Sequence, residues 1–105
     1  MKRRIWRYLL VIVLSNERIT KDSLNSTLFQ NLRYLYGEQI VVKTWPKVIY
    51  FNPKSKEAII RCSHNAINEV RASLALITKI NDHTAAIHVI RVSGTSKSLK
   101  GFLEN

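Results

Sequence analysis

The sequence has little cysteine, glycine or proline, and it has no long hydrophobic run. A single cysteine cannot form an intramolecular disulfide, and three glycines with two prolines exclude a collagen-like repeat. No apolar stretch approaches the roughly 20 residues that cross a bilayer. The length of 105 residues predicts one α+β domain over residues 1–105. The lone cysteine favours a reducing, cytoplasmic location.

Acidic residues are also scarce, and their shortage gives the chain its most unusual property. Seven Asp and Glu stand against 17 Lys and Arg, a formal net charge of +10 at pH 7. A surplus of this size favours a polyanionic partner, with nucleic acid and an anionic membrane surface as the two candidates. A basic surface without such a partner is the other interpretation.

The acids are spread too thinly for a local metal-binding motif. They occupy positions 17, 22, 38, 57, 69, 82 and 104, and no two are closer than five positions. Nucleases that use Mg²⁺ hold their ions with clustered carboxylates. An autonomous nuclease would therefore require Glu17, Asp22 and Asp82 to converge in the fold. We expect the chain to carry no catalytic residues and no metal site.

Hydrophobic periodicity predicts alternating strands and helices. Leucines recur at four- and three-residue steps over residues 20–36, which is typical of an amphipathic helix that Thr20 or Asp22 caps and Gly37 ends. Pro46 requires the second predicted strand to be bent, split or at an edge. The predicted strands are 4–15, 40–51, 57–62 and 86–93, and the predicted helices are 20–36, 65–80 and 96–103.

This order of elements predicts a ferredoxin-like fold. The order β-α-β-β-α-β matches a sandwich in which two helices pack on one face of a four-stranded antiparallel sheet, here followed by a short C-terminal helix. We expect the first and third strands in the centre, which agrees with the apolar middle of the first strand.

Cys62, His64, His83 and His88 are the candidate zinc ligands and nucleophiles. The C-x-H spacing is shorter than the usual zinc spacing, and no orienting acid lies near Cys62 in the sequence. Because Cys62 stands in an aliphatic strand, a packed thiol with surface or strand histidines is the expected arrangement.

Two basic regions are candidates for phosphate contact. The first is the N-terminal cluster Lys2, Arg3, Arg4 and Arg7. The second is the turn Ser93-Gly94-Thr95 with the following Lys97 and Lys100, where glycine allows a tight turn and a new helix presents N–H groups. A capped helix start with solvated lysines is the alternative for this turn.

Arg61 and Arg91 lie in otherwise apolar strands, where each is either a solvated residue or a contact to RNA or a partner. The third strand contains no aromatic residue, which disfavours the stacking of single-stranded bases on it. Recognition is therefore expected to rest on phosphates and shape.

Three segments resemble a known family. They are RYLLV at 7–11, AIIRC at 58–62 running into a helix that ends ITKI at 77–80, and VSGT at 92–95 followed by Lys97, Lys100 and Phe102. Their order and spacing are similar to those of the archaeal Pop/Rpp-type subunit family of ribonuclease P. The long tail of the eukaryotic relatives is absent, which favours the short archaeal type.

The resemblance implies a noncatalytic protein subunit that binds ribonuclease P RNA, which removes 5′ leaders from precursor tRNA. It implies that the RNA supplies the active site and the Mg²⁺, and that the protein binds no cofactor. It implies that the chain pairs with ribonuclease P protein component 3 and that two such pairs can associate into a heterotetramer. It also implies indirect contact with precursor tRNA and no contact with a membrane. The alternative is a basic adaptor that binds a protein or membrane surface and not RNA.

Overall fold

A four-stranded antiparallel sheet forms the centre of the structure, a computed structural model that describes residues 5–101. The strands are β1 (Trp6–Leu14), β2 (Lys47–Asn52), β3 (Glu57–Ser63) and β6 (Ala86–Ser93). Their order is β2-β3-β1-β6, which confirms that the first and third predicted strands lie in the centre.

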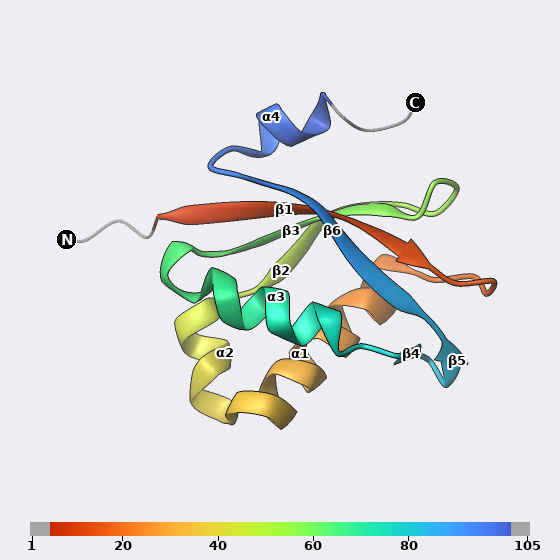
Figure 1. Cartoon of the computed structure of the whole chain (residues 1–105), viewed down its shortest axis with the longest axis horizontal. Coiled ribbons are helices and arrows are strands. Elements are labelled where there is room, and N and C mark those ends of the chain that lie inside the picture. Colours follow the sequence, from red (N-terminus) through yellow and green to blue (C-terminus); the bar gives the residue numbers. More distant parts are fainter. Residues whose placement is uncertain (1–4, 102–105) are drawn as a thin grey trace.

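Helices cover both faces of this sheet, but unequally (Figure 1). On one face lie α1 (Lys21–Tyr36), α2 (Glu38–Thr44) and α3 (Ile67–Ala75), the last preceded by the 3-10 turn η1 (His64–Ala66). The short helix α4 (Ser96–Lys100) lies on the opposite face, which we call the outer face. The predicted α+β fold with a short C-terminal helix is confirmed.

The main core lies between the sheet and α1 to α3. Alternate residues of β1, namely Leu9, Val11 and Val13, point toward the helices and are almost fully buried. They pack against the leucines that recur every four residues along α1. Leu24, Leu28 and Leu32 are fully buried there. Full burial of each such side chain stabilises the fold by about 1.5–3 kcal/mol.

A second, smaller core lies on the outer face. Leu10 of β1 and Ile59 of β3 are paired across the strands, and Leu99 of α4 covers them. The first strand is therefore buried on both faces in its middle, as its sequence predicts.

The first helix begins and ends where the sequence places its boundaries. The Oγ1 atom of Thr20 accepts a hydrogen bond of 3.1 Å from the backbone N–H of Ser23. Gly37 ends α1 with φ +87°, a backbone conformation that side chains with a Cβ rarely adopt.

The predicted strand over 40–51 is wrong in its first half. Residues 38–44 form α2, although Ile40, Val41 and Val42 have high strand propensity. The positive φ of Gly37 redirects the chain into a second helix, which buries Ile40 and Thr44 one turn apart. Burial against the core overrides local propensity here, and β2 begins only after Pro46, at the edge of the sheet.

The predicted helix over 65–80 is too long. It ends at Ala75, and the next segment forms the hairpin of β4 (Lys79–Ile80) and β5 (His83–Thr84). Asn81 and Asp82 take positive φ of 53° and 65°, as a tight two-residue hairpin turn requires. Ile77 and Ile80 are buried as the helical spacing predicts, but Ile77 lies in the connection after α3 and Ile80 lies in β4.

Candidate nucleic-acid interface

Arg7 is the one member of the N-terminal basic cluster that the structure describes. Lys2, Arg3 and Arg4 lie outside the described residues 5–101. Arg7 stands near the start of β1, half-buried, and its guanidinium donates a hydrogen bond of 3.1 Å to the carbonyl oxygen of Trp6.

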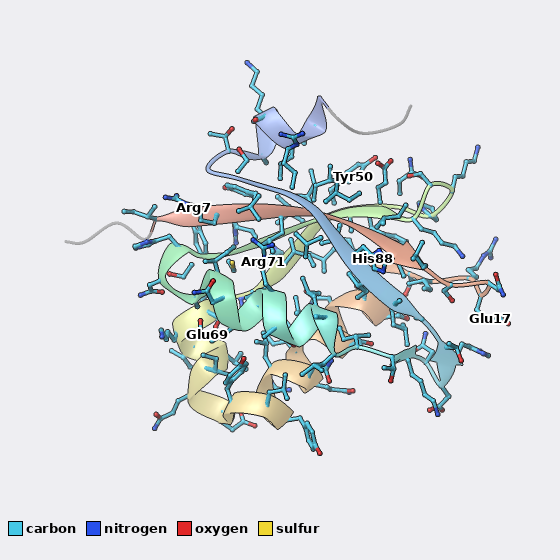
Figure 2. The ribbon with its side chains drawn as sticks, viewed as in Figure 1. Arg7, Glu17, Tyr50, Glu69, Arg71 and His88 are labelled. Atoms are coloured by element: carbon cyan, nitrogen blue, oxygen red, sulfur yellow. The ribbon has the colours of Figure 1, made fainter. Side chains whose placement is uncertain are left out.

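The fold brings Arg7 to the second predicted region. Tyr8 of β1 pairs with Ser93 of β6, so the turn after Ser93 lies beside the start of β1 (Figure 1). A Cβ atom placed on Gly94 would lie 3.8 Å from Nη1 of Arg7. In Figure 2, Arg7 is at the end of the sheet opposite Glu17. We call this end, with Arg7, the turn 93–95, Lys97 and Lys100, the basic end.

Hydroxyl groups organise the turn between β6 and α4. Oγ of Ser93 accepts from the N–H of Thr95 at 3.2 Å, and Oγ1 of Thr95 accepts from the N–H of Ser98 at 3.3 Å. The predicted capped helix start is therefore present, and the cap already occupies one of the N–H groups expected to meet a phosphate. Lys97 and Lys100 are exposed and supply the positive charge of the turn.

The chain bends at Gly94, where the sequence predicts a turn, without the positive φ that favours glycine. Gly37 is the one glycine with positive φ within residues 5–101. Gly94 has no such φ, and an added Cβ would meet Arg7 at an ordinary van der Waals distance.

Arg61 lies on the outer face, beside residues of two neighbouring strands. Its cross-strand partners are Tyr8 of β1 and Lys47 of β2. Its guanidinium carbon is 4.2 Å from the centre of the Trp6 ring. The sequence arguments missed Trp6, although alternation along β1 predicts that Trp6 and Tyr8 share the face that Leu10 occupies.

Arg91 lies in the edge strand β6 and pairs with Leu10 of β1. Its side chain is exposed, and it takes part in an interaction within the protein. Arg91 lies two residues before Ser93 in β6, nearer the middle of the sheet than the turn 93–95.

The four residues considered as candidate zinc ligands lie on four different elements. Cys62 is fully buried as a free thiol, and burial, with a smaller effect of the nearby Glu69 carboxylate, raises its pKa from 9.0 to about 11. His64, His83 and His88 are exposed on η1, β5 and β6 respectively. Across the part of the chain that the structure describes, no three His, Cys, Asp or Glu residues lie close enough to hold a metal ion.

Two of the three acids considered for a nuclease line the same cavity. Glu17 and Asp82 line one cavity of about 800 Å³, together with Lys56 and His83, at the end of the sheet away from Arg7 (Figure 2). Asp22 does not line it. The fold thus brings two carboxylates to one cavity without the third.

None of the helices within residues 5–101 has the length and apolar character needed to cross a membrane.

Comparison with known proteins finds relatives over most of the chain. The chain is 35% identical to ribonuclease P protein component 2 of Pyrococcus furiosus over 94 residues, which cover 90% of this chain and 78% of that protein. It is 33% identical to the protein of the same name from Methanobrevibacter smithii, over 93% of this chain and 88% of the relative.

A solved structure shows the same fold. A chain in the cryo-EM structure of yeast ribonuclease MRP superposes with a TM-score of 0.71 at 15% identity, over 90% of this chain and 78% of that one. The family model of the Rpp14/Pop5 proteins matches residues 7–104. The chain belongs to the Rpp14/Pop5 family.

Proposed function

We propose that this chain is a noncatalytic protein subunit of ribonuclease P, which binds and stabilises the catalytic RNA for removal of 5′ leaders from precursor tRNA. The observation that carries the proposal is the basic end. There Arg7 lies beside Gly94 of the turn 93–95, and the exposed Lys97 and Lys100 follow this turn in α4. Relatives at about a third identity bear the name ribonuclease P protein component 2.

Phosphate neutralisation explains how such a surface stabilises a folded RNA. Each lysine or arginine that meets a phosphate releases condensed counterions, which favours binding and makes it strongly dependent on salt. Positive side chains held on a rigid sheet and helix also reduce the repulsion between RNA strands that pack together. On this proposal the RNA holds the Mg²⁺ and the active site, and the protein binds no cofactor.

The proposed protein partners are ribonuclease P protein component 3 and, through self-association of two pairs, a second copy of this chain. Exposed apolar side chains on the α2 side support a protein contact. Val42 and Trp45 are 64% and 52% exposed, and both line a cavity of about 390 Å³ with Phe29 and Pro46. A cytoplasmic location, expected from the lone cysteine, is part of this proposal.

Reconstitution of leader cleavage tests the function. Catalytic RNA, precursor tRNA and Mg²⁺ are combined with and without the full chain and its protein partner. We expect the protein to raise the cleavage rate and to lower the Mg²⁺ concentration that cleavage requires, because it replaces part of the counterion charge.

Two outcomes would overturn the proposal. Robust Mg²⁺-dependent cleavage by the protein without RNA would show that it is a nuclease in its own right. Negligible retention on structured RNA at about 0.15 M salt would favour the basic adaptor that binds a protein or membrane surface instead.

A further inference from the structure

An aromatic residue and an arginine form a stacked pair at the basic end of the outer face. The guanidinium carbon of Arg61 lies 4.2 Å from the centre of the Trp6 ring. Both side chains are partly exposed, so the pair is reachable from solution. A guanidinium over an indole face is held by a cation–π attraction, which fixes both planar groups.

The hydrogen bonding of Arg61 is incomplete within the described protein. Its Nε atom is buried, and no acceptor within residues 5–101 meets it. An unpaired buried donor costs about 1–3 kcal/mol, so such a group usually has an acceptor from a ligand or an ordered water. Because this atom has almost no exposed surface, a bound molecule would reach it only after a shift of the Arg61 side chain.

The surroundings of this pair favour an anion. Lys47 is the cross-strand partner of Arg61, is exposed, and also lines the cavity beside Trp45. Glu57, the acid of β3, pairs with Ile12 and Asn52 toward the other end of the sheet. Helix α4 covers Leu10 and Ile59 in the middle of the outer face, while Trp6 and Arg61 keep part of their surface exposed.

We propose that Trp6 and Arg61 form a stacking site for one unpaired RNA nucleobase, with Lys47 in contact with the adjoining phosphate. A nucleobase has a flat π face that stacks on indole and guanidinium planes. The aromatic partner comes from β1, which the sequence argument against base stacking left out because it considered the third strand alone. The inference rests on the proposed RNA-binding function and adds a base contact to it.

Comparison of two ligands of equal charge tests the base contact without altering the site. One ligand is an oligoadenylate of about eight nucleotides, and the other is an abasic ribose–phosphate chain of the same length. The Trp45→Phe protein, in which Trp6 is the remaining tryptophan, is titrated with each at about 0.15 M salt. We expect the oligoadenylate to quench the fluorescence and to bind about tenfold more tightly than the abasic chain.

Matched variants separate the stacking from the charge. Trp6→Ala should weaken oligoadenylate binding about tenfold and leave its salt slope unchanged, whereas Trp6→Phe should retain most of the affinity. Lys47→Ala should lower the salt slope by about 0.7, the value for one phosphate contact on a single strand. In the Trp6→Phe protein, Trp45 serves as the control fluorophore and should show little quenching.

The failure of this inference differs from failure of the proposed function. Equal affinity for the two chains, with intact binding of the catalytic RNA, would overturn the stacking site alone. Loss of protein-partner binding in the Trp6 variants, with unchanged binding of oligoadenylate, would reassign the surface to a protein contact. The ligand comparison needs no variant at Trp6 or Arg61, so it decides the matter even where Trp6→Ala fails to fold.

Discussion

Arg7 and Gly94 lie side by side at one end of the sheet, although they stand near opposite ends of the chain. A Cβ atom added to Gly94 would be 3.8 Å from Nη1 of Arg7, within ordinary van der Waals contact. The pairing of Tyr8 with Ser93 fixes this neighbourhood. A charge introduced at position 94 therefore acts directly on the guanidinium that we assign to phosphate contact.

Two substitutions at Gly94 exploit this contact. Gly94→Ala should change neither the affinity for catalytic RNA nor its salt dependence, and stability should stay within about 0.5 kcal/mol. Gly94→Glu places a carboxylate beside Arg7, so it should lower the slope of log affinity against log salt by about one unit and weaken binding several-fold. Filter binding over a salt series measures both effects. Equal slopes for the two variants would show that Arg7 makes no phosphate contact.

The lysines of α4 provide an independent test of the basic end. Replacement of both Lys97 and Lys100 by Ala should lower the salt slope by about two units, since each phosphate contact contributes about 0.9. The control is the double variant Lys54→Ala and Lys79→Ala, which removes the same charge elsewhere. Lys54 is exposed in the β2–β3 turn, and Lys79 is exposed in β4. An equal loss of slope in both double variants would indicate diffuse attraction by net charge and not a defined contact region.

Periodicity predicted most of the fold because burial in this chain follows simple patterns. The leucine stripe of α1 is buried as its spacing requires, and the boundary at Gly37 follows from a backbone angle that favours glycine. The errors occur where tertiary packing decides between two local options. Ile77 is buried as its helical spacing predicts, yet it lies in the connection between α3 and β4, and Ile40 is buried by a helix where a strand was predicted.

The candidate site was predictable only in part, because its composition depends on strand register. The sequence identifies Arg7 and the turn 93–95 as basic or turn-forming, but their contact follows from the pairing of β1 with β6. The position of Arg61 over Trp6 likewise requires the register of β1 with β3. Such pairings join distant parts of the chain, and no local pattern encodes them.

Trp45 provides a test of the protein contact. It is 52% exposed beside the α1–α2 cavity, and its φ of 48° is one that asparagine adopts readily. Trp45→Asn should therefore keep the backbone and lower the affinity for the proposed partner, protein component 3, by about tenfold or more, as expected for a central aromatic contact. Isothermal titration calorimetry measures the affinity. Tyr34→Asn is the control, because Tyr34 is 87% exposed and does not line the cavity. Equal effects of the two substitutions would exclude this cavity as the docking surface.

Burial of Cys62 predicts a loss of stability in alkali. Its pKa is raised from 9.0 to about 11, chiefly by burial, so the folded protein keeps the proton when the unfolded chain has already lost it. The thiol therefore contributes its full stability below pH 9; about 2 kcal/mol of it is lost by pH 11, and the total loss approaches about 3 kcal/mol above pH 11. Urea unfolding of the wild type and of Cys62→Ala over this range isolates the effect. Cys62→Ala lowers the free energy of unfolding by a packing cost that does not depend on pH. Because only the wild type loses the contribution of the thiol in alkali, the difference in free energy of unfolding between the two proteins should narrow as the pH rises. Parallel curves from pH 9 to 11 would show that the thiol ionises alike in the folded and unfolded chains.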